Sequence, residues 1–341
     1  MKRISVIVPC RNEIRHIDKF IECLFEQELP EGYTLDVFIA DGMSNDGTVE
    51  RLEGYRREHP ELSIISNPAG IVSTGLNAAL PHTGDIVVRM DVHTEYARDY
   101  IRQCVEVLEE TGAGNVGGAS RTVAKCYVQK AISLAYHSFL GSGGARFHNP
   151  DYEGPVDTVI YGCWRKQTLE ELGGFDEALV RNQDDELNLR LIRRGGKVWQ
   201  SRRIRSWLNP RSTFRGLFRQ YYEYGYWKVH VIRKHKIPAS WRHLVPAAFV
   251  SIIGMLAALS LFLPWARLAL MALAGIYAAA VVGVSAMLCS NRTLLRYLPA
   301  VPLVFAIYHF SYGSGFLRAM VDCMSGNQPQ AKTSKAAVPA Q

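Results

Sequence analysis

Asp91 and His93 stand two residues apart, directly after a mostly apolar run that ends at Met90. A carboxylate and an imidazole at this spacing can share one divalent cation. Their oxygen and nitrogen donors suit Mn²⁺ or Mg²⁺, with phosphate oxygens completing the coordination shell. The pair alone is a weak signal, because a single Asp or His in a loop is usually only solvated. Asp91 and His93 are therefore candidate metal ligands that need support from other segments.

A second acidic group, Asp184-Asp185-Glu186, opens a stretch in which apolar residues recur at helical spacing. Clustered carboxylates repel one another unless a cation or a raised pKa relieves the repulsion. A carboxylate in that situation can act as a general base. The same residues would also compensate the charge at a helix N-terminus. The sequence leaves these two interpretations equally open.

Residues 210–228 mix arginines with aromatic residues and include Arg211, Gln220, Tyr224 and Trp227. Arginine makes bidentate contacts with phosphate, so this segment is a candidate for binding a diphosphate or an acceptor. Tyrosine and tryptophan also anchor proteins at the headgroup level of a membrane. Nucleic acid is not expected as a partner, because the basic segment runs directly into a long apolar stretch.

The first 120 residues alternate between short β-branched runs and amphipathic stretches. This alternation predicts an α/β fold with a parallel sheet and helices on both faces, in which ligands bind beyond the carboxyl ends of strands. Polar clusters lie at three such ends, so we expect them to face one crevice: Pro9–Glu13, Asp41-Gly42 and Asp91–His93. The predicted strands are Ile4–Val8, Leu35–Ala40, Leu62–Ile65 and Asp85–Met90, and the predicted helices are Ile14–Phe25, Thr48–Glu58, Ile71–Leu80 and Ala97–Glu110.

Three later segments have weaker local patterns. Gly173-Gly174 is expected to end a helix, because glycine readily adopts the left-handed conformation at a helix C-terminus. Residues 184–194 are expected to be helical, and the glycine-rich stretch Gly141–Gly144 is expected to be a mobile loop.

Residues 244–263 are uncharged and, at about 1.5 Å per residue, long enough to cross about 30 Å of hydrocarbon. A second uncharged run, 268–290, follows a short connection and predicts a helical hairpin. A third run, 297–317, contains prolines and glycines, and its pattern fits a span, a re-entrant segment or an interfacial helix. Core helices of a soluble domain are not favoured, because nothing nearby could cover so much apolar surface. Basic residues between 233 and 242 place that side of the membrane in the cytoplasm by the positive-inside rule.

The composition excludes several classes of protein. Hydrophobic residues make up 48% of the 341 residues and charged residues 21%, which rules out intrinsic disorder. Seven scattered cysteines show neither a disulfide framework nor zinc-ligand spacing. The N-terminus lacks the long apolar segment of a signal peptide, so we expect the bulk of the chain to stay in a reducing cytoplasm.

The polar segments together resemble family 2 glycosyltransferases with the GT-A fold. Val6–Glu13, Asp41–Thr48 and Gly84-Asp85 with Asp91-x-His93 resemble the nucleotide-sugar half of that family, and Gly173–Glu177 with Asp184–Leu187 resembles its acceptor half. The resemblance covers about residues 1–230. The Asp-x-His variant and the apolar C-terminal part are similar to the ExoA-like enzymes of succinoglycan and related exopolysaccharide assembly.

The resemblance implies a role for individual residues. Pro9, Arg11 and Glu13 would line the nucleotide pocket, and Asp41 would accept a hydrogen bond from the uracil imide. Asp91 would bind the donor diphosphate through the cation, with His93 where the family more often has a second Asp. Asp184 matches the family's general base. Gln183 stands where a Glu is usual, so Asp185 remains an alternative base.

The resemblance also implies an activity and its partners. It implies an inverting transferase that moves a hexose, expected to be glucose, from a UDP-sugar to a polyprenyl diphosphate-linked saccharide. The reaction would take place at the cytoplasmic face of a bacterial inner membrane, in contact with membrane lipids and other polysaccharide assembly enzymes. One sugar per acceptor is expected, since no Gln-x-x-Arg-Trp motif is present.

Three alternatives stay open. The chain could transfer the sugar directly to a polyprenyl phosphate. It could instead be an inactive nucleotide-sugar-binding subunit, an alternative that Gln183 and His93 would support. A transporter is the third, but the apolar runs contain no acidic residue.

The expected domain organisation has four parts. Residues 1–230 form the GT-A domain, divided into a nucleotide-sugar half (1–120) and an acceptor half (121–230). A basic juxtamembrane segment (231–243) and a membrane domain with two or three apolar helices (244–318) follow, and residues 327–341 are expected to be a disordered tail.

Overall fold

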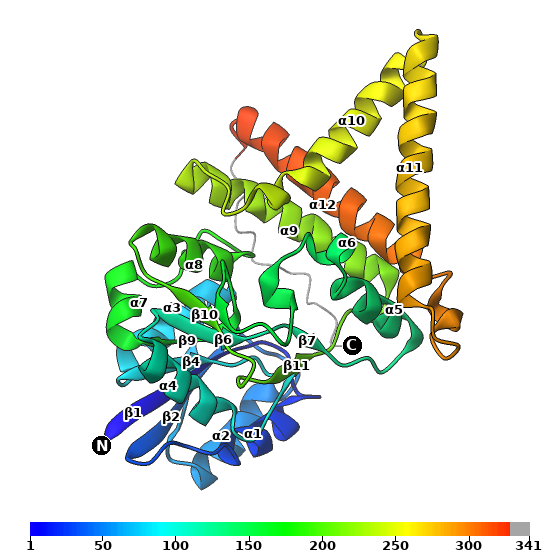
Figure 1. Cartoon of the computed structure of the whole chain (residues 1–341). Helices are drawn as coiled ribbons and strands as arrows, with labels where there is room; N and C mark the ends of the chain where they lie inside the picture. Colours follow the sequence, from blue (N-terminus) through cyan, green and yellow to red (C-terminus); the bar gives the residue numbers. More distant parts are fainter. Residues whose placement is uncertain (328–341) are drawn as a thin grey trace. The chain divides into compact units, whose positions relative to one another are not determined.

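The computed structural model describes residues 1–327, which form two compact units (Figure 1). Unit 1 consists of Met1–Arg121 and Arg146–Leu208. Unit 2 consists of Thr122–Ala145 and the described residues from Asn209 onward. The tail expected over 327–341 lies, apart from Asn327, outside the described residues.

Unit 1 contains an eight-stranded sheet in the order β3-β2-β1-β4-β9-β6-β10-β8. Strands β3, β2, β1 and β4 are parallel, and β10 is parallel to β6, whereas β9 is antiparallel to both of its neighbours. The sheet is therefore mixed and mostly parallel. Its strands are β1 (Lys2–Cys10), β2 (Tyr33–Asp41), β3 (Leu62–Ser66), β4 (Ile86–Arg89), β6 (Asn115–Gly118), β8 (Gly154–Pro155), β9 (Ile160–Arg165) and β10 (Val198–Gln200).

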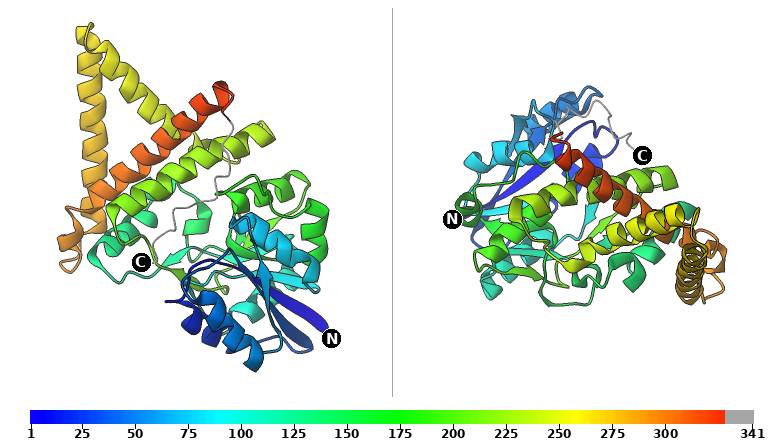
Figure 2. Two further views of the ribbon diagram at one scale, coloured as in Figure 1. Left: turned by 180° about the vertical axis from the view of Figure 1, so that it is seen from behind. Right: turned by 90° about the horizontal axis from the view of Figure 1, so that it is seen from above.

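Helices cover both faces of this sheet, as Figures 1 and 2 show. Successive side chains of a strand point to opposite faces, so Val6 and Val8 of β1 join one buried cluster and Ile7 joins another. The first cluster includes residues of α1 and α4, and the second includes residues of α3, α7 and α8. The helices of unit 1 are α1 (Ile17–Phe25), α2 (Thr48–Glu58), α3 (Val72–Ala79), α4 (Tyr100–Thr111), α7 (Lys166–Leu172) and α8 (Gln183–Arg193), with short 3₁₀ turns η1 (Leu80–His82) and η2 (Arg146–His148).

The predicted elements of the first 120 residues are confirmed, with ends that differ by a few residues. The glycine stop is confirmed as well, since Gly173 follows α7 in the left-handed conformation with φ of +82°. The acidic stretch that begins at Asp184 lies in α8, as expected.

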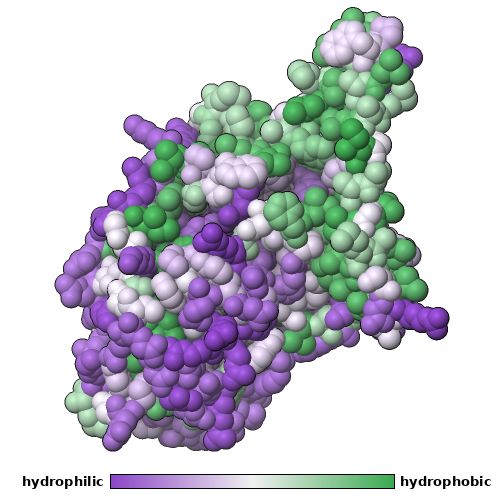
Figure 3. Space-filling view, in the orientation of Figure 1, coloured by the Kyte–Doolittle hydropathy of each residue, from purple (hydrophilic) through white to green (hydrophobic). Residues whose placement is uncertain are grey.

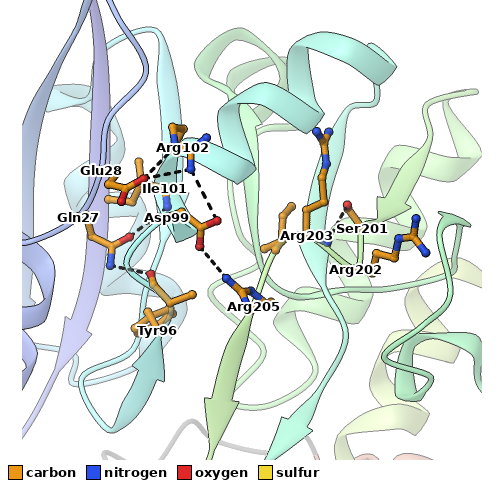
Figure 4. A network of polar contacts seen from close by, with 12 residues as sticks. Gln27, Glu28, Tyr96, Asp99, Ile101, Arg102, Ser201, Arg202, Arg203 and Arg205 are labelled. Carbon is orange, nitrogen blue, oxygen red and sulfur yellow. Dashed lines mark hydrogen bonds and ion pairs between the residues drawn. The ribbon is translucent and has the colours of Figure 1, made fainter.

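A polar network joins the end of α1 to a small second sheet (Figure 4). This sheet has the order β5-β11-β7, with β5 at Thr94–Tyr96, β7 at Arg121–Thr122 and β11 at Ser206–Leu208. Gln27 donates to the Ala97 carbonyl at 2.9 Å and accepts from the Ile101 amide at 3.1 Å. Asp99 pairs with Arg205 at 3.3 Å. These bonds fix the segment that carries Tyr96, which contacts the candidate site described below.

Unit 2 is helical. Its elements are α5 (Tyr127–Tyr136), α6 (Phe139–Ser142), α9 (Phe214–His235), η3 (Trp241–His243), α10 (Val245–Leu259), α11 (Pro264–Leu288), η4 (Leu295–Tyr297) and α12 (Val301–Met324).

Helices α9 and α12 lie side by side in Figures 1 and 2. Their backbones come into very close contact. A Cβ atom added at Gly225 would lie 2.0 Å from the Tyr312 carbonyl oxygen, and one at Gly315 would lie 2.1 Å from that of Tyr222. Only glycine permits this approach, because any side chain would collide with backbone.

Helices α10 and α11 form the predicted hairpin. Trp241–Leu259 and Pro264–Leu288 are long and apolar enough to cross a membrane, and most of their residues lack cover within the protein. The exposed apolar side chains include Leu261, Phe262 and Leu268, and the hairpin is largely hydrophobic in Figure 3. Within residues 1–327, α12 is not among the stretches that pass this test. The third run forms a helix that continues beyond 317 and includes Arg318 and Asp322.

Two expectations differ from the structure. The stretch Gly141–Gly144 is not wholly a loop: α6 ends at Ser142 and is capped by the Ser138 side chain, which accepts from the Gly141 amide at 3.1 Å. The chain segments 122–145 and from 209 onward, the second of which contains the arginine- and aromatic-rich residues 210–228, group with the helical unit 2, whereas we expected residues 121–230 to form the acceptor half of one domain. Their apolar side chains pack with α12, as Leu217 and Ala131 do.

Candidate active site

The carboxyl ends of β1 and β2 lie next to each other. The register pairs Cys10 with Asp41, and the Gly42 amide donates to the Cys10 carbonyl at 2.8 Å. Pro9 pairs with Ala40 one step earlier. The structure therefore brings together the first two predicted clusters, Pro9–Glu13 and Asp41-Gly42.

Hydrogen bonds lock these two loops into one surface. The Asn12 amide donates to Ser44 Oγ at 2.8 Å, and the Glu13 amide donates to Thr48 Oγ1 at 2.9 Å. Asp41 is buried, and its Oδ2 accepts from the Ser44 amide at 3.1 Å. Ser44 and Thr48 thus hold the loop geometry, and Asp41 is oriented by the backbone of its own turn.

Arg11 lies against Gly42 and Gly70. A Cβ atom at Gly70 would lie 2.7 Å from Arg11 Nη1, and Gly70 has φ of +63°, so both space and backbone conformation favour glycine there. The Nε atom of Arg11 is buried and has no hydrogen-bond partner in the described residues. A buried guanidinium nitrogen without a partner is costly, and an anionic ligand would satisfy it.

Asp91 follows β4 and is held from two sides. Its amide donates to the Tyr96 hydroxyl at 2.7 Å, and its carboxylate lies 3.3 Å from the guanidinium of Arg89. His93 Nδ1 lies 3.7 Å from Glu13 Oε1, which joins the third cluster to the first. All three predicted clusters therefore meet at the carboxyl edge of the sheet, as expected.

Arg89 also reaches the second acidic group. Its Nη1 donates to Asp184 Oδ1 at the start of α8, while the Arg89 side chain itself is only 6% exposed. Burial raises the pKa of Asp184 most; Arg89 lowers it, while Asp91 and Asp185 raise it, and the result is a pKa above the ordinary value. Asp184 keeps 31% of its side chain exposed, so solvent or a ligand can reach it.

Left-handed backbone is concentrated around this site. Among the described residues outside glycine, five have positive φ, and four of them lie at or beside this site. Asn12 and Met43 lie in the loops after β1 and β2, Asn182 directly precedes α8, and Tyr161 lies in β9. Such conformations cost free energy and persist where the surrounding structure enforces them, which is common at functional sites. Tyr161 has its ring 5.8 Å from the Arg89 guanidinium carbon.

The residues missed by sequence reasoning are Arg89, Tyr161 and Gly70. Arg89 had one visible signal, since it is the charged residue at the end of the otherwise apolar strand Ile86–Arg89. The other two act through contacts with arginines that only the folded chain reveals.

The remaining candidates lie elsewhere. Asp185 is in the first turn of α8 beside Asp184. The diphosphate or acceptor candidates lie in unit 2: Gln220 donates to the Tyr224 hydroxyl at 3.0 Å on α9, Trp227 is buried on the same helix, and Arg211 precedes it. Their role in binding stays a prediction.

The residues present suit a cation that is bound together with its ligand. Within residues 1–327 no group of three or more His, Cys, Asp or Glu side chains is arranged to hold a metal by itself. Asp91 and His93 supply one oxygen and one nitrogen ligand type, with Glu13 beside His93. Mg²⁺ and similar ions are commonly bound by one or two protein groups plus substrate phosphates, so this donor set fits a diphosphate-bound cation.

Comparison with known proteins places the chain in a family. The sequence model for Glycosyl transferase family 2 matches residues 5–172. The succinoglycan biosynthesis protein ExoA of Rhizobium meliloti (strain 1021) is 30% identical over 320 residues, which cover 93% of this chain and 94% of that protein. The chain therefore belongs to glycosyltransferase family 2 and is a glycosyltransferase.

Two further proteins are similar over most of the chain. A dolichyl N-acetyl-alpha-D-glucosaminyl phosphate 3-beta-D-2,3-diacetamido-2,3-dideoxy-beta-D-glucuronosyltransferase of Methanococcus voltae is 28% identical over 260 residues, covering 73% of this chain and 79% of that protein. The mannosyltransferase PcManGT of Pyrobaculum calidifontis, solved with GDP-Man and Mn²⁺, has a TM-score of 0.60 at 21% identity and covers 94% of this chain and 88% of that chain. This likeness supports the GT-A fold predicted from the sequence.

Proposed function

We propose that this glycosyltransferase moves a hexose, with glucose as the expected sugar, from a UDP-sugar to a saccharide carried on polyprenyl diphosphate. The product would enter bacterial exopolysaccharide assembly. The observation that carries the proposal is the Arg89 bridge, which holds Asp91 and Asp184 at one site although they are far apart in sequence. A donor-binding carboxylate beside a base with a raised pKa is what a glycosyl transfer needs.

The proposed reaction is a single displacement. The acceptor hydroxyl oxygen attacks the anomeric carbon and its proton passes to Asp184. As the new carbon–oxygen bond forms, the bond between the anomeric carbon and the phosphate oxygen breaks, and UDP leaves with that electron pair. The anomeric configuration inverts. Asp184 suits the base role because its pKa is raised, which brings it closer to the pKa of the hydroxyl group whose proton it accepts.

The chain's own residues supply the donor site. Arg11, whose buried Nε has no partner among the described residues, would face the anionic or nucleotide part of the donor. Asp41 would accept a hydrogen bond from the uracil ring of the donor. Asp91 and His93 would hold a divalent cation, Mn²⁺ or Mg²⁺. When bound, the cation would offset the charge that builds on the leaving diphosphate.

The helices of unit 2 support a lipid-linked acceptor. The hairpin α10–α11 exposes apolar side chains at a length that fits a bilayer, and basic residues between 233 and 242 precede it. We infer a location in the bacterial inner membrane with unit 1 on the cytoplasmic side. The named Methanococcus relative acts on a dolichyl-phosphate-linked sugar, which supports an acceptor of this class.

The test is UDP release by the full chain in detergent. Panels of UDP-, GDP- and dTDP-sugars are supplied with Mn²⁺ or Mg²⁺, with and without a lipid-linked oligosaccharide fraction. The proposal predicts UDP release that requires both the metal and the lipid fraction. Activity on polyprenyl phosphate alone would favour direct charging of the carrier. UDP binding without turnover on any acceptor, including a fraction shown to contain the acceptor, would favour a non-catalytic subunit.

A further inference from the structure

Arg89 is a buried arginine that touches both halves of the candidate site. Its Nε and Nη2 lie 3.3 Å from Asp91 Oδ1, and its Nη1 donates to Asp184 Oδ1. Three segments meet at this one side chain: the end of β4, the loop after it, and the first turn of α8. Arg89 can bind both carboxylates at the same time, because its guanidinium group offers separate N–H donors to each.

The position of Arg89 is restricted from a third side. The ring of Tyr161 lies 5.8 Å from the guanidinium carbon, and the Tyr161 hydroxyl contacts Thr94 Oγ1. Tyr161 itself adopts left-handed backbone with φ of +62°. An arginine held by two carboxylates and an aromatic ring has little freedom to swing away, so it offers Asp184 a fixed partner.

The ion pair uses only one oxygen of Asp184. Arg89 binds Oδ1, so Oδ2 lies outside this contact, and the Asp184 side chain is 31% exposed. A base needs one oxygen for the incoming proton, and the second can serve as an anchor.

We propose that Arg89 is a positioning residue of the transfer reaction, which anchors Asp184 through Oδ1 and ties its orientation to Asp91 on the donor side. This inference rests on the proposed function, in which Asp184 is the base and Asp91 binds the donor. It assigns to Arg89 an effect on turnover that acts through Asp184.

A purely structural role is the competing explanation. Arg190 provides a matched comparison, because it forms a buried ion pair with Glu186 at 2.6 Å on the same helix and also donates to the Leu172 carbonyl. If Arg89 only braces α8, replacing either arginine by lysine will lower stability in the same way. If Arg89 positions the base, only its replacement will change turnover at unchanged donor affinity.

The experiment compares Arg89→Lys and Arg190→Lys with the wild-type full chain in detergent. Lysine keeps the charge but, as a single ammonium, loses the planar fork that serves two carboxylates. The readouts are kcat and KM with the lipid-linked acceptor, UDP affinity in the presence of Mn²⁺ by calorimetry, and the melting temperature. We expect Arg89→Lys to lower kcat about a hundredfold with UDP affinity changed less than about fivefold. Arg190→Lys should lower the melting temperature and leave kcat within about threefold.

Two results would overturn the inference. One is a wild-type kcat in folded Arg89→Lys, and the other is a fall in kcat that is matched by an equal fall in UDP affinity. Should Arg89→Lys fail to fold, Thr94→Val serves instead, since it removes the hydroxyl that contacts Tyr161 at little change in volume. We expect a fall in kcat of about fivefold with unchanged UDP affinity, and a wild-type kcat in that variant would equally overturn the inference.

The same assays separate this inference from the proposed function. If the wild-type chain binds UDP but transfers nothing to the lipid-linked acceptor, the proposed function fails and the role of Arg89 fails with it. If the wild-type chain transfers sugar and Arg89→Lys does so equally well, only the inference about Arg89 is wrong.

Discussion

The active-site edge of unit 1 and the α9–α12 pair of unit 2 both hold charged groups, but in different ways. At the active-site edge, Arg89 joins carboxylates from distant parts of the chain. In the helix pair, Asp322 is paired with Arg318 one turn away, at 3.1 Å on the same helix, and accepts from Tyr226 of α9 at 3.2 Å.

The difference shows what each region is built for. The backbone around the active-site edge adopts left-handed conformations at several non-glycine residues. The helix pair instead gains its contact from glycines that let two backbones touch. In the proposed function the first region receives a ligand, whereas the glycines of the second let two helices pack closely. Substitutions in the two should therefore affect different measurements.

The largest effect is expected from Asp91→Ala. Loss of this carboxylate removes the proposed cation ligand and leaves Arg89 with a single partner, so transfer should fall by about a thousandfold or more. UDP affinity in Mn²⁺ should fall as well, and the dependence of UDP binding on Mn²⁺ should disappear in a calorimetric titration. Asp18→Ala, which removes an exposed carboxylate paired with Arg51, is the control and should leave both quantities unchanged. Wild-type metal dependence in Asp91→Ala would contradict the assigned role.

Gly315→Val should act on stability instead. Its Cβ would lie 2.1 Å from the Tyr222 carbonyl, so α9 and α12 must separate, at a cost of roughly 1–3 kcal/mol. The melting temperature in detergent should fall, while UDP affinity per folded molecule should stay constant. Gly275→Val is the matched control, because that position on α11 has open space around it. Equal melting temperatures for the two variants would show that the close backbone contact does not contribute to stability.

The pH profile of kcat should fall on the acid side. Asp184 must be deprotonated to accept a proton, and its pKa is raised, chiefly by burial, so activity should decline as the pH falls through a value above the usual Asp pKa of about 4. Below that value kcat should drop about tenfold per pH unit. Asp185→Asn removes one of the charges that raise this pKa, so the acid limb should shift to lower pH. An acid limb that stays in place in Asp185→Asn would argue against Asp184 as the titrating group.

Gly70→Ala should give the smallest effect and bear mainly on the donor. Its Cβ would displace the end of the Arg11 side chain, so we expect UDP affinity to fall by about tenfold or less. Gly112→Ala is the matched control: Gly112 has a similar φ of +60° but nothing within 4 Å of the added atom. Both variants should lose similar stability from backbone strain. Only Gly70→Ala should weaken UDP binding. Equal UDP affinity in the two variants would contradict the proposed role of Arg11 in binding the donor.

Much of unit 1 could be predicted from the sequence, because strand and helix signals are local. The β-branched run Ile4–Val8 and the amphipathic pattern of α1 each depend on neighbours within a few residues, and parallel strands bring their carboxyl ends to one edge by geometry. The meeting of Pro9–Glu13, Asp41 and Asp91 therefore followed from alternation alone. The Asp184 candidate came from charge clustering together with family resemblance.

The parts that were not predicted depend on long-range packing. The bridge between Arg89 and Asp184 requires knowing which strand end lies beside the start of α8, and no local pattern carries that information. Residues 122–145 group with α9–α12 because their apolar side chains pack there, which a boundary drawn from composition at 230 could not show. Two assignments stay predictions. One is Asp185 as an alternative base, and the other is the set of acceptor or diphosphate contacts: Arg211, Gln220, Tyr224 and Trp227.

The central claim is that Asp184 is the base of a glycosyl transfer whose donor binds at Asp91, and Asp184→Asn tests it most directly. The variant keeps the shape of the side chain but cannot accept the proton. Transfer to the lipid-linked acceptor should fall by roughly a hundredfold to ten-thousandfold, while UDP affinity in Mn²⁺ stays close to that of the wild type. Asp185→Asn, measured in parallel, should retain transfer. Wild-type transfer by Asp184→Asn together with loss of transfer in Asp185→Asn would contradict the claim and move the base by one residue.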